Sequence, residues 1–250
     1  EVAIADDQSG IAFDGANTVA YTLTFSEAVQ SVTEGDLTVS GAESFSVAHT
    51  ADTDTAYVTV TVADDSMDNV SITVNDSIVD IAGNPLIEAV DNLQTVDTVN
   101  PTAVYSSEII APNQGDGVSS DDDSIVAYTV DFSEPVSGIT AGDIRVEGGA
   151  VVAETVDLSE DGLQATFSVQ ASDDSVADLV VTVKDTVTDL NGNRLVESSS
   201  APVAVDTVNP EVTIADDQSG IAFDGANTVA YTLTFSEAVQ SVTEGDLTVT

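Results

Sequence analysis

Apolar and polar residues alternate along three stretches in the first part of the chain. Residues 19–25 read Val-Ala-Tyr-Thr-Leu-Thr-Phe, residues 56–62 read Ala-Tyr-Val-Thr-Val-Thr-Val, and residues 70–74 read Val-Ser-Ile-Thr-Val. Every second side chain of a β-strand faces the same side, and Val, Thr and Tyr favour strands. No stretch shows a convincing i, i+3, i+4, i+7 repeat of a long helix. The pattern therefore predicts an all-β chain.

Seven short strands fit the first hundred residues, with turn signals between them. We expect these strands near residues 2–5, 18–26, 36–40, 43–49, 55–63, 69–75 and 88–96. Seven strands in about 100 residues are typical of an antiparallel β-sandwich of the immunoglobulin type. The chain lacks the Cys…Trp…Cys pattern of antibody domains, so the prediction concerns the architecture alone.

The chain also repeats itself. Residues 97–101 read Asp-Thr-Val-Asn-Pro and recur unchanged at 206–210, and residues 211–250 then repeat residues 1–40 with only two differences. We call the two pentapeptides the first joint and the second joint, because such a recurrence predicts boundaries between tandem modules. The expected units are a first module at 1–101, a second module at 102–210 and a partial third module at 211–250. The third module holds only the first three strands, so we expect unpaired strand edges and half a core.

Acidic residues dominate the charge of all three units. The chain has 45 Asp and Glu against 3 Lys and Arg, a net charge of −42. This charge excludes nucleic acid as a direct partner, and no apolar run is long enough for membrane insertion. High charge often accompanies disorder, but the 42% hydrophobic content is arranged with period two. High salt or bound cations must therefore offset the charge. Disulfides do not contribute, because there is no cysteine.

The joints offer oxygen ligands between modules. Each places an Asp and an Asn three residues apart, at Asp97 and Asn100 and again at Asp206 and Asn209, and a Pro stiffens the connection that follows. Carboxylate and amide oxygens are the ligands of Ca²⁺, which takes six to eight of them in flexible geometry. We therefore predict calcium ions at the joints of a monomeric tandem array, in which neighbouring modules of the same chain are the other partners.

Further candidate ligands fall in the loops at the two ends of each sandwich. Successive strands run up and down, so alternate loops lie at the same end, and each joint is expected to face the N-terminal end of the module that follows. The candidates at the N-terminal ends are Glu27, Asp36, Asp80 and Asn84 in the first module, Glu134, Asp143, Asp185, Asp189 and Asn193 in the second, and Glu237 and Asp246 in the third. The candidates at the C-terminal ends are Asp6, Asp7, Asp65 and Asp174.

Calcium suits these ligands better than magnesium or zinc. Mg²⁺ retains its waters and demands a stricter octahedron, and Zn²⁺ favours His or Cys, of which the chain has only His49. Two carboxylates about 4 Å apart repel by roughly 1 kcal/mol in water and several-fold more in a partly dry joint. A divalent ion reverses the sign of this energy. Calcium is thus predicted to switch the array from flexible to extended.

Each feature also has a simpler interpretation. Acidic loops are typical of solvated surfaces and of adaptation to salt. The Asp-x-x-Gly-Asn loops at 80–84 and 189–193 fit turn chemistry with Gly at positive φ, and Asp97 with Asn100 fits an Asx-type turn. The joint favours ion binding over these alternatives, because several acids are expected to meet there and the pentapeptide recurs unchanged.

These residues resemble a family of bacterial immunoglobulin-like repeats. Residues 25–29 (Phe-Ser-Glu-Ala-Val) and 35–37 (Gly-Asp-Leu) look like its FSEPV…GD signature. Residues 132–136 and 142–144 match it better, since the first module has Ala28 where the signature has Pro. The Asp-x-x-Gly-Asn loops resemble the DxAGN loop of the family, and the joints resemble its VDTxxP boundary. The joints are also similar to cadherin linkers, where Asp and Asn before a Pro hold calcium.

Acidic, near-identical repeats of this kind look like the extender region of long RTX-type adhesins of marine Gram-negative bacteria, a group that includes ice-binding and biofilm adhesins. The resemblance implies type I secretion to the bacterial cell surface and calcium at the linkers. It also implies a rod that projects a distal ligand-binding domain away from the cell.

The sequence thus favours a calcium-rigidified spacer over two other classes of function. The alternative is a polysaccharide-binding surface module, but such sites usually display exposed aromatic platforms, and the chain has five Tyr and no Trp. We do not expect an enzyme. Paired carboxylates can hydrolyse glycosides, but here the acids are spread over every loop, and one His without Cys leaves few nucleophile–base pairs.

Overall fold

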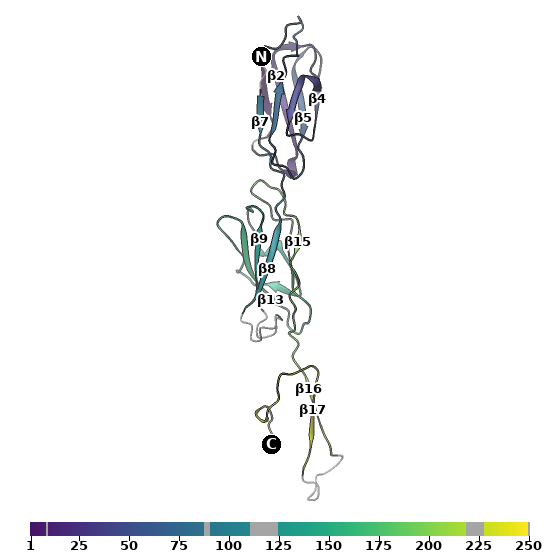
Figure 1. Cartoon of the computed structure of the whole chain (residues 1–250), viewed down its shortest axis with the longest axis vertical. Helices are drawn as coiled ribbons and strands as arrows, with labels where there is room; N and C mark the ends of the chain where they lie inside the picture. The colour runs from purple at the N-terminus through teal and green to yellow at the C-terminus, as the bar shows by residue number, and fades with distance from the viewer. Residues whose placement is uncertain (9, 88–90, 111–124, 219–227, 250) are drawn as a thin grey trace.

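The chain is an elongated series of units. The structure, a computed structural model, describes residues 1–8, 10–87, 91–110, 125–218 and 228–249. Figure 1 shows the first module at one end, the second module next to it and the third module at the other end. Two separate hydrophobic cores occupy the first two units, one between Val2 and Val96 and the other between Val126 and Val205. In the described part of the chain, no helix has the length and apolar character needed to cross a bilayer.

The first module is a sandwich of two antiparallel sheets. The strands are β1 (Val2–Asp6), β2 (Thr18–Val29), β3 (Leu37–Ser40), β4 (Ser44–His49), β5 (Thr53–Thr61), β6 (Val70–Val74) and β7 (Asp91–Gln94). One sheet has the order β1-β2-β5-β4 and the other β3-β6-β7. These are the ABED and CFG sheets of an immunoglobulin constant-type domain. The predicted all-β sandwich is confirmed, and the expected start of the seventh strand at 88–90 lies outside the described residues.

The second module repeats this arrangement with a more divided fourth strand. Its strands are β8 (Ala103–Ile109), β9 (Ile125–Phe132), β10 (Ile144–Glu147), β11 (Gly149–Val151), β12 (Asp157–Leu158), β13 (Gln164–Ala171), β14 (Val180–Val183) and β15 (Ser198–Ser199). The sheets have the orders β8-β9-β13-β11 and β10-β14-β15, and β12 also pairs with β13. Both modules therefore present corresponding loops at corresponding ends.

Alternation along the strands builds the cores. In β2 the side chains of Val19, Tyr21, Leu23 and Phe25 are buried, while the residues between them face outward. Short 3-10 turns precede or connect strands: η1 (Asp14–Ala16), η2 (Glu34–Asp36), η4 (Ala141–Asp143) and η5 (Glu244–Asp246). The last three each end in an Asp that closes a capping box with the Thr before the turn. This local pairing satisfies backbone N–H groups that the turn leaves open.

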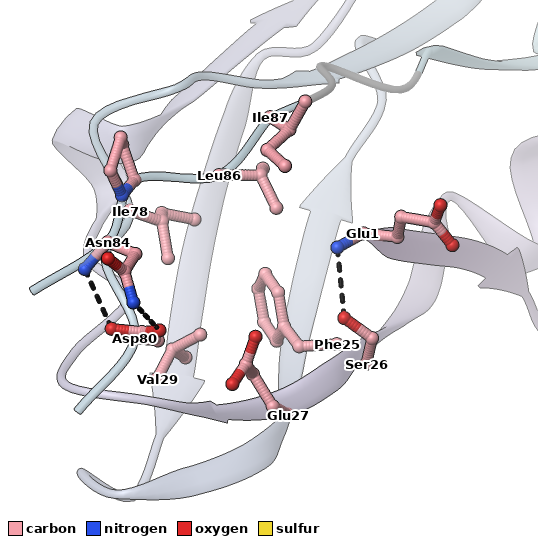
Figure 2. A pocket seen from close by; sticks show the side chains of 11 residues that line it. Glu1, Phe25, Ser26, Glu27, Val29, Ile78, Asp80, Asn84, Leu86 and Ile87 are labelled. Atoms are coloured by element: carbon pink, nitrogen blue, oxygen red, sulfur yellow. Dashed lines mark hydrogen bonds between the residues drawn. The ribbon is translucent and has the colours of Figure 1, made fainter. Parts of the chain in front are cut away.

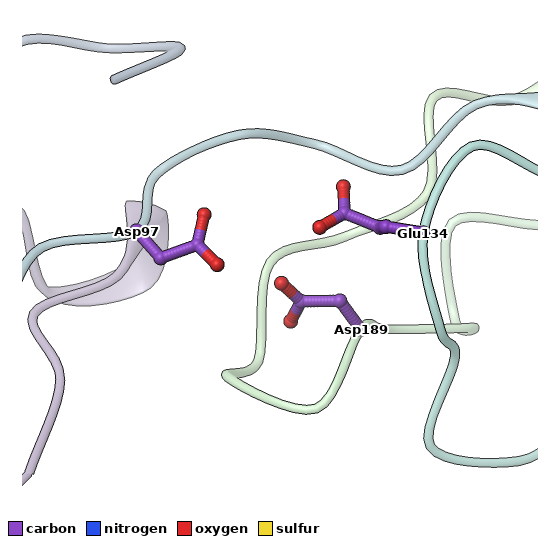
Figure 3. A group of neighbouring side chains, drawn as sticks. All are labelled: Asp97, Glu134 and Asp189. Atoms are coloured by element: carbon purple, nitrogen blue, oxygen red, sulfur yellow. The ribbon is translucent and has the colours of Figure 1, made fainter. Parts of the chain in front are cut away.

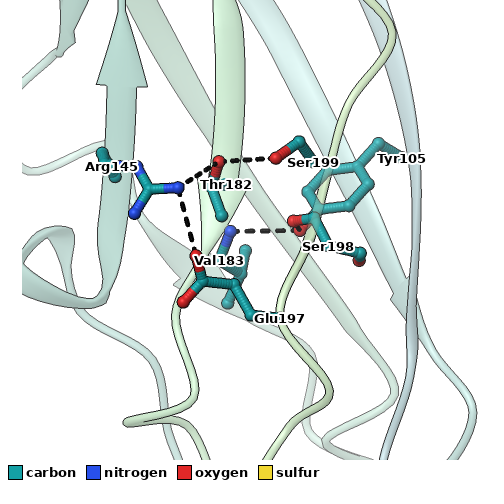
Figure 4. Close-up of polar contacts among 7 residues, drawn as sticks. All are labelled: Tyr105, Arg145, Thr182, Val183, Glu197, Ser198 and Ser199. Carbon is teal, nitrogen blue, oxygen red and sulfur yellow. Dashed lines mark hydrogen bonds and ion pairs between the residues drawn. The ribbon is translucent and has the colours of Figure 1, made fainter.

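Tyr105 fastens the two sheets of the second module to each other (Figure 4). Its hydroxyl donates to the carbonyl oxygen of Ser198 at 2.6 Å and accepts the N–H of Val183 at 3.0 Å. On the same side, Arg145 pairs with Glu197 at 3.1 Å. The edge strand β8, which begins directly after the first joint, is thereby held against the opposite sheet.

The third module is half a sandwich. In the described residues it consists of β16 (Val212–Asp216) paired with β17 (Tyr231–Phe235) and of the turn η5. Val212 is 48% exposed, whereas the identical position Val2 in the first module is 7% exposed. β16 and β17 are the two strands described in this unit, and the face that is buried in the first module is exposed on them.

Candidate metal centre

The first joint is held by the first module. The N–H of Asp97 donates to the carbonyl of Ala12 at 2.9 Å. Thr98, which is fully buried, donates its hydroxyl to the carbonyl of Ala63 at 2.8 Å and accepts the N–H of Ser66 at 2.9 Å. The backbone position of Asp97 is therefore set by the packing of the first module.

The loop at 189–193 is held by its own aspartate. Asp189 Oδ1 accepts the backbone N–H groups of Asn191, Gly192 and Asn193 at 2.8, 2.6 and 2.8 Å. Gly192 has φ +106°, a conformation that favours glycine. Turn chemistry therefore explains the Asp-x-x-Gly-Asn motif, and it also fixes the Asp189 carboxylate at the end of the second module.

Three carboxylates from the two modules converge at the first joint (Figure 3). Asp97 comes from the joint, Glu134 follows β9, and Asp189 comes from the turn; one oxygen of each lies within 4.8 Å of the others. Asp97 and Asp189 are buried, and Glu134 is partly buried. The spacing is about twice the ~2.3–2.6 Å distance between calcium and its oxygen ligands. These residues fit one hard cation between them.

The environment of Glu134 favours the uncharged acid when no cation is bound. Burial, together with the neighbouring charges of Asp189 and Asp97, raises the pKa of Glu134 from 4.5 to about 7. At such separations each charge pair costs on the order of 3–4 kcal/mol at an effective dielectric constant of about 20. The Oε1 atom of Glu134 is buried and has no hydrogen-bond partner. The Oδ1 atom of Asn100, three residues after Asp97, is in the same situation. Two buried oxygens are thus left without a donor.

The basic side chains of the protein are engaged elsewhere. Arg145 pairs with Glu197, Arg194 pairs with Asp185 at 3.3 Å, and Lys184 donates to the carbonyl of Gly142 at 2.7 Å. These three are the complete set of Lys and Arg in the chain. Among the described contacts, none of them neutralises the three carboxylates at the joint.

Two asparagines of the turn add neutral contacts across the joint. Asn191 Nδ2 donates to Asp97 Oδ2 at 2.7 Å, and Asn193 Nδ2 donates to the Asp97 carbonyl at 2.9 Å. Asn193 is fully buried, and its Oδ1 accepts the N–H of Asp14 at 2.7 Å. Asn193 was expected as a ligand, but here its amide joins the two modules directly. Sequence reasoning missed the contacts of Asn191 and Asp14. The only signal for Asn191 is that the first module has Ala82 at the same position.

The other candidates at the N-terminal end of the second module lie outside the cluster. Asp143 accepts hydrogen bonds from Thr140 and Thr186 at 2.7 Å each and closes the capping box of η4. Asp185 forms the exposed ion pair with Arg194. Both carboxylates thus have local partners.

The corresponding end of the first module is open (Figure 2). Glu27, Asp80 and Asn84, the counterparts of Glu134, Asp189 and Asn193, line a cavity of about 460 Å³. Asp80 accepts the backbone and side-chain N–H groups of Asn84, both at 2.7 Å. Asp36 accepts the hydroxyls of Thr33 and Ser77. The same residue types therefore line a cavity at this end of the first module.

The remaining candidates are dispersed. Asp6 accepts the side-chain N–H of Asn92, and Asp7 accepts the N–H of Ala20. Asp65 and Asp174 occupy left-handed turn positions, with φ 51° and 50°.

At the second joint, Asp206 accepts the N–H of Val208, and Asn209 follows it in the same pentapeptide. In the third module, Asp246 closes the capping box of η5. Glu237 again has a buried Oε1 without a hydrogen-bond partner.

No protein-family model and no curated protein matches the chain. Among solved structures, it is similar to domains 5–6 of the surface-layer protein SbsC, with 17% identity over 83% of this chain and 98% of that one and a TM-score of 0.24. It is also similar to domains 4–9 of SbsC, with 18% identity over 90% of this chain and 34% of that one and a TM-score of 0.26. A third similar structure is InvD of Yersinia pseudotuberculosis, with 16% identity over 87% of this chain and 63% of that one and a TM-score of 0.31. At these TM-scores the similarity carries no argument about function.

Proposed function

We propose that this chain is a series of spacer modules of a bacterial cell-surface adhesin, in which Ca²⁺ bound at the first joint fixes the direction of one module relative to the next. The observation that carries the proposal is the convergence of Asp97 from one module with Glu134 and Asp189 from the other. A cation at this point has ligands on both sides of the joint. Its binding energy is therefore also docking energy between the modules.

Calcium is the ion that the ligands favour. The three carboxylates form an all-oxygen set without His or Cys. Such a set suits a hard cation, and calcium accepts varied arrangements of oxygen ligands, whereas magnesium demands a near-ideal octahedron. The role we propose is structural rather than catalytic.

A spacer function explains why the modules are near copies of each other. A module whose role is to add length performs the same task at every position in the chain. The lengths of neighbouring modules add up only when the joint between them is stiff. The motifs that resemble RTX-type extender repeats support secretion to the cell surface and a distal domain with another function. Export by a type I system is part of the same proposal.

The test is calcium titration of the whole chain by calorimetry, with small-angle scattering in calcium and in EGTA. We expect calcium to increase the radius of gyration and to raise the melting temperature. Asp97→Ala is expected to abolish most of both effects while the two sandwiches stay folded. Asp206→Ala makes the same change in the second joint, away from Glu134 and Asp189, so it serves as the matched control. Superimposable scattering profiles with and without calcium would falsify the proposal.

A further inference from the structure

The first joint contains a second set of contacts that needs no cation, although one of them engages the Asp97 carboxylate of the cluster. The loop between β1 and β2 in the first module places Phe13 directly before the turn η1. Its neighbour Ala12 is fully buried and accepts the N–H of Asp97. The loop and the joint therefore occupy a fixed position relative to each other, and both face the Asp189 turn.

The ring of Phe13 lies against one glycine from each module. A Cβ atom on Gly15 would be 2.7 Å from Phe13 Cε2, and a Cβ on Gly192 would be 3.3 Å from the same atom. At Gly83, the counterpart of Gly192 in the first module, a Cβ would meet nothing within 4 Å. The Phe13 ring of the first module thus packs against the second module at Gly192, where there is no side chain.

Two hydrogen bonds also join the modules at this contact, and one of them is donated to a carboxylate. The N–H of Asp14 donates to Asn193 Oδ1 at 2.7 Å, and Asn191 Nδ2 donates to Asp97 Oδ2 at 2.7 Å. An amide that donates to a carboxylate offsets part of its charge, and it does so without an ion. This half of the joint is therefore complete in the protein alone.

The two kinds of module are not interchangeable at these positions. Between β8 and β9 the second module has no aromatic residue in the segment 110–124, so its sequence offers no counterpart of Phe13. Conversely, the first module has Ala82 where the second has Asn191, so it lacks the amide that reaches the joint. The residues that make the contact occur together only when a first-type module precedes a second-type module.

We propose that Phe13 and Asn191 form a cation-independent clasp that selects a second-type module as the neighbour of a first-type module. The clasp holds the two modules in register before the ion binds. A second-type module that precedes a first-type module has no counterpart of Phe13 in the loop that would face its neighbour. The inference rests on the direct contacts and stands whether or not calcium is the ion.

The test uses distances between two spin labels on the whole chain. The protein has no cysteine, so cysteines at the exposed positions Ser46 and Thr166, one in each module, are the sole attachment sites. In EGTA we expect a narrow distance distribution for this labelled parent. Phe13→Ala should reduce the ratio of docked to undocked modules by about five- to tenfold, the loss expected for a half-buried ring. Asn191→Ala, which restores the sequence of the first module's loop, should reduce it by about two- to fivefold, the loss of one hydrogen bond.

Two controls separate the clasp from general damage. Phe223→Ala makes the same change in the repeated sequence of the third module and should leave the distribution unchanged. Gly192→Ala approaches the clasp from the other module, and Gly83→Ala is its matched control, since both glycines have positive φ. We expect Gly192→Ala to broaden the distribution and Gly83→Ala to leave it narrow.

The proposal is overturned if the parent is already broadly distributed in EGTA, or if Phe13→Ala and the parent give the same distribution there. The failure of the calcium proposal looks different: the parent distribution would not respond to calcium, while the effect of Phe13→Ala in EGTA would persist.

Discussion

The N-terminal ends of the first and second modules carry the same residues in different states. Glu27, Asp80 and Asn84 line an open cavity, and Asn84 is exposed. In the second module the joint covers the equivalent end, so Asp189 is only 3% exposed and Asn193 is fully buried. Among the described residues, three carboxylates come together only at the end of the second module, where the first joint lies against it.

This difference shows that the candidate site belongs to the pair of modules. Each module alone offers two carboxylates at one end and an Asp with an Asn at the other. Docking excludes water from these groups, which strengthens their repulsion and raises the pKa of Glu134 to about 7. Docking of the modules therefore creates the repulsion between carboxylates that a bound cation would relieve.

The largest effect should come from removing a carboxylate at the covered end. We expect Glu134→Ala to weaken calcium binding at least about 10- to 100-fold, the range seen when even an outer-shell partner of a metal is lost. Glu27→Ala removes the counterpart at the open end and should leave the affinity of the first joint unchanged. Calorimetric titration of both variants measures the difference, and equal losses would show that the two ends do not differ as ion sites.

A second, smaller effect concerns the buried amide. Asn193→Ala leaves the Asp97 carbonyl and the Asp14 N–H without their partners, at an expected cost of about 1–3 kcal/mol. Asn84→Ala removes an exposed contact to Asp80 and should cost about 0.5 kcal/mol. Hydrogen exchange in EGTA, read separately in β14 and β6, assigns each loss to its module. Similar losses in both modules would contradict the distinction between a covered and an open end.

The third prediction uses pH to sharpen the same comparison. Calcium must displace the proton of Glu134, so below pH 7 the affinity should fall by up to about tenfold per pH unit, and above pH 7 it should level off. Without calcium, the free energy of unfolding changes with pH in the opposite direction to the calcium affinity. Since the folded pKa is raised from 4.5 to about 7, stability is highest below about 4.5 and declines as the pH rises to about 7.

Glu134→Gln should remove both trends. The measurements are calcium titrations and melting temperatures between pH 5 and 8. An unaltered pH dependence in this variant would assign the titration to another group.

The immunoglobulin-like sandwich could be predicted from the sequence because period-two alternation is a local property. Stretches such as 19–25 and 56–62 specify which side chains are buried before any partner strand is known. The joints could also be found in the sequence, because the same pentapeptide occurs at 97–101 and at 206–210. The Gly at positive φ in each Asp-x-x-Gly-Asn loop also followed from turn chemistry alone.

Sequence alone did not distinguish the carboxylates that meet from those that have local partners. Nineteen residues were candidates, and the structure brings three of them together as a possible ion site. Asp36, Asp143 and Asp246 instead close capping boxes, a role set by a Thr three residues earlier. The Thr-x-x-Asp spacing indicates the capping role, but it does not exclude ion binding, because an Asp in such a loop can serve either role.

The sequence by itself determined the strands and the all-β sandwich, since alternation depends on neighbours within a few residues. Only the tertiary structure decided that Asp97 meets Glu134 and Asp189, and that Phe13 rests on Gly192. These contacts join residues about 40 to 180 positions apart. Their geometry depends on how two folded surfaces fit, which no local pattern encodes.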